Sequence, residues 1–351
     1  MNVIRLGVVG CGKVVCRIHL PALRRMRGVR LVALADPVPT RRAEAARLAG
    51  GAAGFINCDE LLRSSDVDAV LICTPSAQHA ECAIAALSKR KHVYIEKPLA
   101  SNLKQAESIV RAWEGTGLVG MCGFNYRHHP LYSEAREMVA SGTLGEVVAV
   151  RSCFTSAGEW IDEWRQQRSL GGGVLLDLAG HHIDLAAFIL GQRICEVAAQ
   201  VTSWRSEQDT AWMNMTLENG VVMHSFFSLR GTDSNCFEIY GELARLTVDH
   251  VAGTLEIVRR GRRKLIHRVR GAVGQGWSRL RHGLMRGRDP SYELAFSKFV
   301  NAVANRSQHV DPDLHDALRV SQVIDAAERS AVTGQRWRIK SMLNESSLLE
   351  R

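Results

Sequence analysis

Short apolar runs alternate with helical patterns along the first 123 residues of the chain. Between the runs, apolar residues recur at the spacing of amphipathic helices. Strands that alternate with helices in this way predict βαβ units around a parallel sheet. The predicted strands cover 4–9, 30–35, 69–73, 93–95 and 118–122, and the predicted helices cover 18–26, 39–48, 78–88 and 103–113.

The pattern changes near Phe124, where apolar runs begin to follow one another without long helices between them. Consecutive strands joined by turns predict a mostly antiparallel sheet. In the turn Glu218-Asn219-Gly220, we expect Asn-Gly to supply the positive φ angles of a hairpin. The predicted strands cover 146–154, 197–203, 211–217, 221–227, 236–240, 245–248 and 254–258, and the predicted helices cover 130–140, 174–190, 292–305 and 314–333.

These patterns predict an α/β chain of two domains. Residues 1–123 are expected to form a doubly wound parallel sheet with its helices. Residues 124–340 are expected to form an α/β domain with a mostly antiparallel sheet, and 341–351 a tail. A chain of 351 residues is long enough for two cores of this kind.

The charge of the chain is concentrated in one segment. The net charge is +9, but residues 259–288 hold eleven Lys or Arg and no acid, so the remainder carries −2. A near-neutral body with one basic segment does not indicate a nucleic-acid-binding fold. Within this segment Trp277, Leu280, Leu284 and Met285 stand at helical spacing. The alternatives are a site for an anionic substrate, a membrane-surface helix at 271–288, a solvated insertion or an oligomer contact.

The nine cysteines include no Cys-x-x-Cys pair and no array with zinc spacing, so we expect no metal site. Several of them lie in apolar runs, as small core residues do, which fits a reducing compartment. The first residues lack the basic and apolar regions of a secretory leader, and no stretch of about 18 residues is uninterruptedly apolar. We therefore expect a cytoplasmic protein without a membrane span.

A glycine-containing loop follows the first predicted strand and opens the first predicted helix. In this position glycines permit a tight turn and close approach of the backbone to a pyrophosphate, and the helix start offers N–H donors. Val15 stands where Gly or Ala is usual, and an ordinary strand-to-helix turn is the alternative interpretation. The residues expected to contact a dinucleotide here are Gly10, Cys11, Gly12, Lys13 and Val14.

Asp36 ends the second predicted strand. A carboxylate at this point accepts hydrogen bonds from the adenosine ribose hydroxyls and repels a 2′-phosphate, which favours NAD over NADP. Arg41 and Arg42 follow closely and can weaken this preference, and Asp36 can instead be a turn residue before Pro37. Together, the loop and the carboxylate predict a Rossmann domain that binds NAD, with NADP as the alternative.

Three further segments point to one family: Cys73-Thr74-Pro75 with His79 after it, Glu96-Lys97-Pro98 at a strand end, and 171–184 with Asp177 and His181. Together these motifs resemble the glucose–fructose oxidoreductase / inositol dehydrogenase (Gfo/Idh/MocA) family, over nearly the whole chain. The resemblance implies a Rossmann domain, a second domain with a large open sheet, bound NAD(P), and a homodimer or homotetramer often packed through that sheet. It also implies a cis bond before Pro98.

Oxidation of a secondary alcohol needs a hydride acceptor, a base and a cation near the oxygen. Asp177 and His181 stand at i and i+4, on one helix face, so His181 is expected to be the acid/base and Asp177 its anchor or the substrate's. Lys97 follows a parallel strand, where ligands bind, and is expected to stabilise the oxygen or relay its proton. Each alone can be structural: a surface lysine, a helix cap and a semi-buried histidine.

Further residues are expected around this chemistry. Thr74, Pro75, His79, Glu96 and Asn125 are expected to line the cofactor. Five others are expected at the substrate rim, where Trp and Arg suit a hydroxyl-rich ring or a carboxylate, although each can equally be structural: Arg127, Trp160, Trp164, Arg165 and His182.

The motifs together favour an NAD(P)-dependent oxidoreductase acting on a secondary hydroxyl or keto group. The expected substrate is a sugar, a cyclitol or a related polyol, sugar nucleotides included. One alternative within the resemblance is an NAD-dependent glycoside hydrolase. Another is a non-catalytic nucleotide-binding regulator, which would have no need of Lys97, Asp177 and His181.

Overall fold

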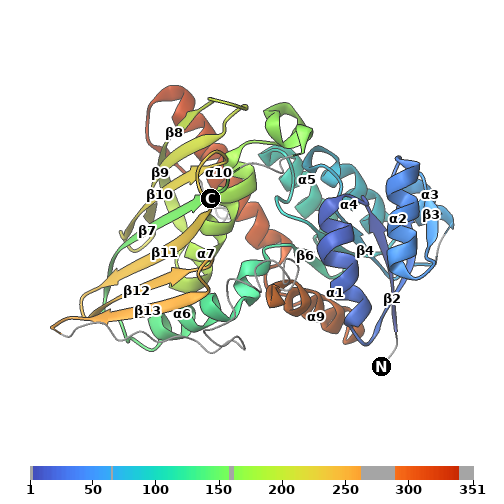
Figure 1. Ribbon diagram of the computed structural model, residues 1–351, viewed down its shortest axis with the longest axis horizontal. Helices are drawn as coiled ribbons and strands as arrows, with labels where there is room; N and C mark the ends of the chain where they lie inside the picture. Colours follow the sequence, from blue (N-terminus) through green and yellow to red (C-terminus); the bar gives the residue numbers. More distant parts are fainter. Residues whose placement is uncertain (1–2, 65, 158–161, 262–288, 340–351) are drawn as a thin grey trace, which may run out of the picture. The chain divides into compact units, whose positions relative to one another are not determined.

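The computed structural model describes residues 3–64, 66–157, 162–261 and 289–339. The chain divides into two compact units. Unit 1 comprises Met1–Pro130, Gln167–Gly172 and Arg270–Ser321, and unit 2 comprises Leu131–Gln166, Gly173–Val269 and Gln322–Arg351. Each unit is built on its own sheet (Figure 1).

Unit 1 contains a parallel sheet of six strands in the order β3-β2-β1-β4-β5-β6. This is the doubly wound order of a dinucleotide-binding fold, so the predicted Rossmann domain is confirmed. The short strand β3 and the helix α3 after it were not predicted. The strands are β1 (Ile4–Val9), β2 (Val29–Ala35), β3 (Ala53–Phe55), β4 (Ala69–Ile72), β5 (His92–Ile95) and β6 (Gly120–Cys122).

Helices and short helical turns accompany this sheet, most of them between its strands. The first begins with a π turn, η1, where the sequence pattern predicted only a later α-helix from 18. They are η1 (Val15–His19), α1 (Leu20–Arg25), α2 (Pro39–Ala49), α3 (Cys58–Ser64), η2 (Ser76–Gln78), α4 (His79–Ser88), α5 (Leu103–Trp113), η3 (Asn125–His128), η5 (Arg168–Leu170) and α9 (Pro290–Ala304).

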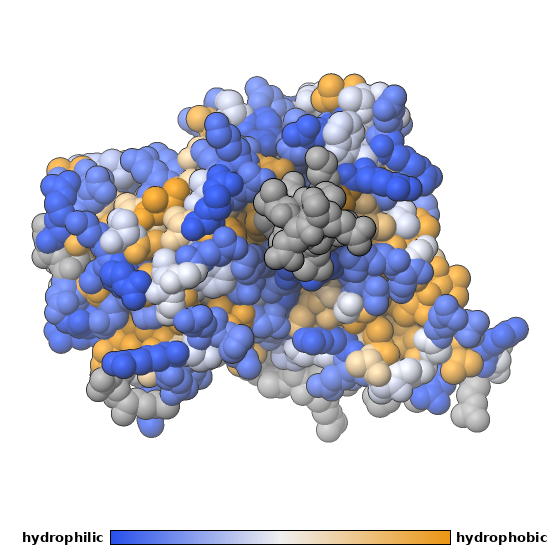
Figure 2. Space-filling view, turned by 180° about the vertical axis from the view of Figure 1, so that it is seen from behind, coloured by the Kyte–Doolittle hydropathy of each residue, from blue (hydrophilic) through white to orange (hydrophobic). Residues whose placement is uncertain are grey.

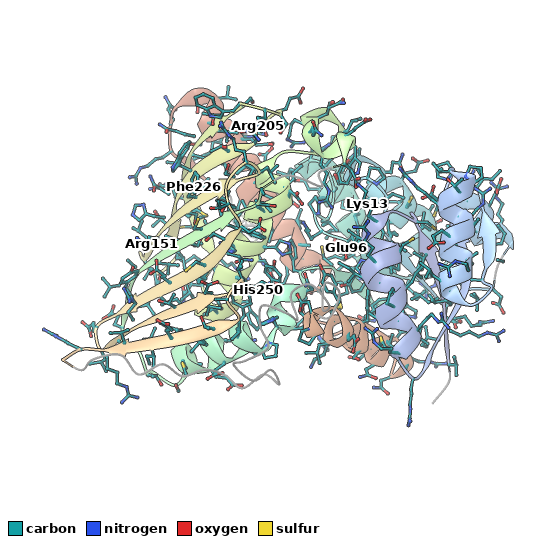
Figure 3. All side chains as sticks on the ribbon, viewed as in Figure 1. Lys13, Glu96, Arg151, Arg205, Phe226 and His250 are labelled. Carbon is teal, nitrogen blue, oxygen red and sulfur yellow. The ribbon has the colours of Figure 1, made fainter. Side chains whose placement is uncertain are left out.

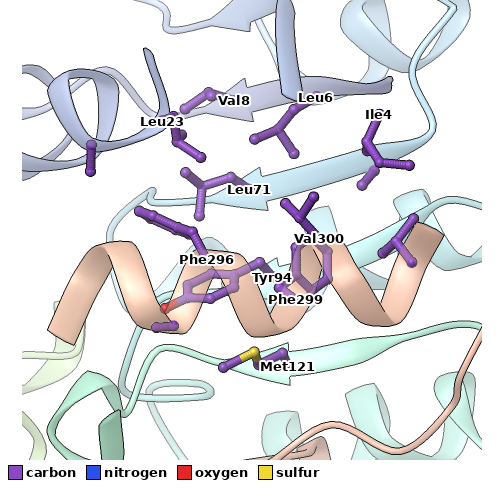
Figure 4. Close-up of a cluster of buried hydrophobic side chains, with 14 of the residues drawn as sticks. Ile4, Leu6, Val8, Leu23, Leu71, Tyr94, Met121, Phe296, Phe299 and Val300 are labelled. Carbon is purple, nitrogen blue, oxygen red and sulfur yellow. The ribbon is translucent and has the colours of Figure 1, made fainter. Parts of the chain in front are cut away.

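Helix α9 belongs to the core of unit 1 although it lies far along the chain. Phe296, Phe299 and Val300 pack with Leu6 and Tyr94 in one buried cluster (Figure 4). The predicted boundary at 123 is therefore too simple. The described residues 289–321 return to the first unit because their apolar face completes its core.

Unit 2 contains an eight-stranded sheet in the order β13-β12-β11-β7-β10-β9-β8-β14. All neighbouring strands are antiparallel except β7 and β10, which are parallel. This confirms the mostly antiparallel sheet. The strands are β7 (Val147–Thr155), β8 (Ile194–Thr202), β9 (Thr210–Leu217), β10 (Val222–Ser228), β11 (Ser234–Gly241), β12 (Ala244–Asp249), β13 (Thr254–Arg259) and β14 (Trp337–Arg338).

The hairpin between β9 and β10 differs in detail from the prediction. Gly220 has a φ of +85°, but Asn219 is not among the described residues with positive φ. The Asn219 side chain instead accepts a hydrogen bond from the main-chain N–H of Val221 at 3.2 Å. One glycine therefore supplies the left-handed turn, and asparagine closes it through its side chain.

The helices of unit 2 include the one that carries Asp177 and His181. They are α6 (Pro130–Ala140), η4 (Glu163–Gln166), η6 (Leu175–Ala179), α7 (Gly180–Leu190) and α10 (Leu314–Thr333), whose first residues belong to unit 1. Among the described residues, Arg168–Leu190 alone is long and apolar enough to span a membrane, but 78% of its apolar window is buried, as in a core helix. Polar residues cover much of the surface drawn in Figure 2, and apolar residues appear there as separate patches.

Candidate active site

The loop after β1 has the backbone that a dinucleotide requires. Gly10 has a φ of +90°, and a Cβ there would lie 2.5 Å from the main-chain oxygen of Cys73. Only glycine therefore allows the loop to touch the end of β4. A Cβ on Gly12 would meet nothing within 4 Å, so this residue faces open space. Lys13 and Val14 then lead into the π turn that begins at Val15 (Figure 3).

Asp36 is held at this loop by main-chain donors. Its Oδ2 accepts the N–H of Cys11 at 2.8 Å and its Oδ1 accepts the N–H of Val38 at 2.9 Å. Each carboxylate oxygen can accept a further hydrogen bond, which leaves capacity for ribose hydroxyls. Arg42 donates to the main-chain oxygen of Asp36 at 2.5 Å and Arg41 is exposed. The carboxylate is thus oriented at the loop, as the prediction for Asp36 requires.

The end of β4 also fits a bound dinucleotide. Within the described residues, the buried Thr74 hydroxyl has no nitrogen or oxygen partner and contacts the Cys82 thiol, so it retains capacity for a hydrogen bond to a ligand. Pro75 follows it and precedes η2. With the glycine loop and Asp36, these residues fit NAD, whose nicotinamide would supply the hydride acceptor or donor.

Lys97 follows β5 directly, at the carboxyl edge of the parallel sheet. The Lys97-Pro98 bond is cis, as the resemblance implied. The Lys97 N–H donates to Oε2 of Glu96 at 3.0 Å. This hydrogen bond fixes the peptide from which the lysine side chain extends.

His79 is buried between the two strand ends. Its Nδ1 lies 2.9 Å from the oxygen of Pro98 and its Nε2 lies 2.9 Å from the oxygen of Thr74. Burial lowers the pKa of His79, although both carbonyls oppose that effect. A neutral imidazole has one N–H, so it donates to one of these carbonyls at a time. Both ring nitrogens face the protein backbone, so any effect of His79 on the cofactor passes through Thr74 and Pro98.

Glu96 lies against a histidine that the sequence patterns did not single out. Oε1 of Glu96 lies 2.8 Å from Nε2 of His19, and the His19 side chain is fully buried on η1. Burial raises the pKa of Glu96, but the contact with His19, the charge of Lys97 and its N–H outweigh burial and lower it. Glu96 is therefore a carboxylate in the folded protein at neutral pH.

Asn125 and Arg127 serve unit 1 internally. Asn125 is buried and donates from Nδ2 to the hydroxyl of Ser291 at 2.7 Å. The guanidinium of Arg127 is 7% exposed, pairs with Asp311 and lies 3.1 Å from Asp316. Arg127 was predicted at the substrate rim. This prediction is wrong, because two carboxylates hold its guanidinium inside the fold.

Asp177 and His181 lie along one helix of unit 2. Asp177 is in the π turn η6, and His181 is in the first turn of α7. A carboxylate oxygen of Asp177 lies 3.4 Å from Nη1 of Arg165. His181 is 6% exposed and its ring centre lies 6.1 Å from that of Phe154. The helix therefore carries an ion-paired carboxylate and an imidazole against an aromatic ring.

His182 is a corrected prediction. It was expected at the substrate rim, but it is fully buried, with rings of Phe154, Phe227 and Phe237 within 6 Å. Its Nε2 lies 3.0 Å from Oδ1 of Asn235. Burial lowers the pKa of His182 to about 4, and the contact with Asn235 only partly opposes this. His182 therefore lies in the aromatic core of unit 2, although it is the next residue after His181 on α7.

Of the other residues expected at the substrate rim, the structure describes Trp164 and Arg165 but not Trp160. The guanidinium of Arg165 lies over the ring of Trp164, 5.3 Å from its centre. Trp160 and the predicted basic helix at 271–288 lie outside the described residues. Over the described part of the chain, no group of three or more His, Cys, Asp or Glu is placed to hold a metal ion.

Comparisons with known proteins place both units in one family. Residues 4–126 match the GFO_IDH_MocA description "Oxidoreductase family, NAD-binding Rossmann fold", and residues 132–247 match "GFO/IDH/MocA C-terminal domain". A dTDP-3,4-didehydro-2,6-dideoxy-alpha-D-glucose 3-reductase from Actinomadura kijaniata is 32% identical over 71% of this chain and 76% of its own. A myo-inositol 2-dehydrogenase from Thermotoga maritima is 28% identical over 72% of this chain and 78% of its own.

Solved structures give the same result. A crystal structure of a mutant 3-ketoreductase from Actinomadura kijaniata, in complex with TDP-benzene and NADP, is 26% identical to this chain. The match has a TM-score of 0.81 and covers 94% of this chain and 98% of that one.

Proposed function

Because the chain belongs to the GFO/IDH/MocA family of NAD(P)-dependent oxidoreductases, which act on CH–OH groups, we propose that its substrate is a sugar, a cyclitol or the sugar of a sugar nucleotide. The observation that carries the proposal is the carboxyl edge of the unit 1 sheet. There the glycine loop, Thr74 and Lys97 follow β1, β4 and β5, three adjacent strands. Ligands of doubly wound sheets bind at this edge.

Lys97 acts on the reacting oxygen in this proposal. Its ammonium donates a hydrogen bond to the substrate oxygen and stabilises the negative charge that grows there during oxidation. Glu96 and His79 fix the main chain on either side of it. Thr74 and Asp36 orient the cofactor that supplies the hydride chemistry.

His181 acts as the general base for oxidation and as the acid for reduction. An imidazole can take up and release a proton, and positioned proton transfer accelerates reactions by about 10² to 10⁴. Asp177 holds a substrate hydroxyl or the imidazole, and its ion pair with Arg165 keeps the carboxylate in place.

We propose NAD as the preferred cofactor. The carboxylate of Asp36 would repel a 2′-phosphate, and Arg42 is directed to a main-chain oxygen. A related 3-ketoreductase was solved with NADP, so the preference is a property to be measured for this chain. The relatives support sugars and cyclitols as the substrate class, because one is named a sugar-nucleotide reductase and one an inositol dehydrogenase.

We also propose that the chain forms a homodimer or homotetramer through the open face of the unit 2 sheet. Trp212 is 47% exposed on β9, its ring centre lies 5.2 Å from that of Phe226, and Arg151 lies nearby on β7 (Figure 3). Exposed aromatic residues on a sheet are typical of interfaces.

We propose a reducing compartment, such as the cytoplasm, for this protein. All nine cysteines are free thiols, which supports this proposal.

The test is a screen for NADH formation. Purified protein is incubated with NAD or NADP and a panel of inositols, sugars and sugar nucleotides, with Lys97→Ala as the inactive control. NADH formation with one class of polyol, absent in the control, is expected. Glycoside cleavage without net NADH would identify a hydrolase instead. Cofactor binding without turnover of any polyol or glycoside would favour the regulator.

A further inference from the structure

His19 is a buried polar side chain for which the proposed reaction has no direct use. It ends η1, the π turn that begins directly after the nucleotide loop. Its ring packs between Tyr292 and Phe296, with ring centres at 5.5 and 5.2 Å, and is fully buried. An apolar side chain would suit this position, because burying a polar group costs free energy unless a partner compensates.

The partner of His19 is Glu96. The two facing atoms, Nε2 and Oε1, lie 2.8 Å apart, and neither has a hydrogen-bonding partner elsewhere in the described part of the chain. Each is therefore the polar neighbour that compensates the other's burial. The second oxygen of the same carboxylate accepts the N–H of Lys97 at 3.0 Å.

The carboxylate of Glu96 has little freedom to move. A Cβ on Gly123 would lie 3.1 Å from both Cδ and Oε2 of Glu96, so the backbone just after β6 lies close to the carboxylate on that side. His19 holds the other oxygen. Loss of the imidazole would therefore release the carboxylate toward the space left behind, and the hydrogen bond to the Lys97 peptide would loosen with it.

We propose that His19 is a positioning residue: through Glu96 it fixes the peptide of Lys97 relative to the nucleotide loop. The inference rests on the proposed function, because Lys97 is the catalytic residue that it positions. His19 reaches Glu96 from the helix that begins at the loop, so one contact joins the cofactor's binding element to the lysine. A misplacement of about 1 Å in such a group can cost on the order of 10² in rate.

The first test reads the Lys97 peptide without any substrate. The chain has eight lysines, so ¹⁵N-lysine labelling gives few amide signals, and Lys97→Arg identifies the one from residue 97. In His19→Leu, amide exchange at Lys97 is expected to rise at least about tenfold, because the carboxylate that accepts the N–H is released. In His19→Gln the exchange is expected to stay within about twofold, because Gln places a nitrogen where Nε2 was.

The matched control is His92→Leu. His92 begins β5, the strand that Glu96 follows, and its Nδ1 accepts the N–H of Val119 at 2.8 Å. The same substitution at the opposite end of this strand is expected to leave Lys97 exchange unchanged. Unchanged exchange in His19→Leu, or equal increases in His19→Leu and His92→Leu, would overturn the proposal. If His19→Leu does not fold, Glu96→Gln is compared with the control by the same measurement.

The second test uses a double-mutant cycle on kcat and on the dissociation constant of NADH. His19→Leu is expected to lower kcat at least tenfold, with the KM of the polyol within threefold, and His19→Gln is expected to restore most of the loss. Because His19 acts through Glu96, adding Glu96→Gln to His19→Leu should lower kcat little further. Multiplicative effects would overturn the proposal. Were no polyol turned over by the wild-type protein, the proposed function would fail, and the amide exchange would still decide the role of His19.

Discussion

The two regions that carry the proposed chemistry are held in place by different means. Around Lys97, the main chain is fixed by side chains from distant segments: Glu96 with His19 from η1 on one side, and His79 from α4 on the other. Along Asp177 and His181, one continuous helix positions both residues. The first arrangement depends on contacts from several distant segments, whereas the second is set by the positions of the two residues on one helix, with Arg165 as a contact from outside it.

The difference predicts how each region responds to substitution. A tertiary support can be removed at a residue that never touches the substrate, so effects on activity should spread around Lys97. On the helix, adjacent residues have separate roles, so effects should change sharply from one position to the next. His181 and His182 are the sharpest case, since the ring of His182 is enclosed by those of Phe154, Phe227 and Phe237, whereas the ring of His181 lies 6.1 Å from that of Phe154.

The largest expected effect is that of Lys97→Ala. The variant should lose at least about 10⁴ in kcat, because stabilisation of the reacting oxygen and proton relay are lost together. The NADH dissociation constant should change by no more than a few-fold, measured by fluorescence titration. Lys104→Ala, at an exposed position of α5, is the matched control. Retention of activity in Lys97→Ala would remove the lysine from the mechanism.

The next effect compares the two neighbouring histidines. His181→Gln should lower kcat by about 10² to 10³, because the acid/base is lost while the helix remains. His182→Gln should change kcat by less than about threefold, because its side chain is fully buried in the core of unit 2. Steady-state kinetics and thermal melts of both variants test this. Similar losses of kcat in the two variants would show that damage to the helix lowers activity, and that the His181 imidazole has no acid/base role of its own.

Motifs and strand periodicity predicted much of this protein. The Rossmann strands, the nucleotide loop and the position of the Asp36 carboxylate follow from short segments whose local geometry is tied to few residue types. The cis bond at Pro98 was implied by the family resemblance. Gly10 illustrates the reason, since its positive φ and the nearness of Cys73 admit no other residue. Such constraints are written locally in the sequence and can be recognised there.

The errors concern residues whose roles depend on distant partners. The sequence alone suggested that Arg127 binds substrate. In the structure it contacts Asp311 and Asp316, which lie far along the chain. His19 carried no local signal, because four strands, β2 to β5, lie between it and its partner Glu96 along the chain. The boundary at residue 123 failed for the same reason, since Phe296 and Phe299 complete a core begun by β1. Contacts between residues far apart in the sequence cannot be predicted from the spacing of residue types along the chain.

A third prediction uses pH to test the burial of His182. Its pKa is about 4 in the folded protein, against 6.5 when unperturbed, so the unfolded chain binds a proton between these values and the folded protein does not. Stability is therefore full above pH 6.5 and is lost as the pH falls toward 4, by about 3 kcal/mol from this residue. In His182→Gln, that part of the loss should disappear from urea denaturation curves at pH 6.5 and 4.5.

The control for this measurement is His224→Gln, which removes an exposed histidine from β10. It should leave the pH dependence of the unfolding free energy unchanged. A parallel decline in wild type and His182→Gln would mean that the imidazole is accessible to protons in the folded state, and would weaken the contrast drawn between His181 and His182.

The smallest expected effect tests whether the cofactor end of unit 1 also relies on tertiary support. Asp36 is held by main-chain N–H groups of Cys11 and Val38, so its loss removes both the ribose acceptor and a contact that shapes the loop. Asp36→Ala should raise the NAD dissociation constant about tenfold, as expected for one or two hydrogen bonds to a charged group, and NADP should lose less. Asp59→Ala, an exposed carboxylate at the start of α3, should change neither affinity. If Asp36→Ala raises the dissociation constants of NAD and NADP equally, the carboxylate shapes the loop but does not select the cofactor. The dependence on tertiary contacts seen at Lys97 would then extend to the nucleotide loop at the same edge of the sheet.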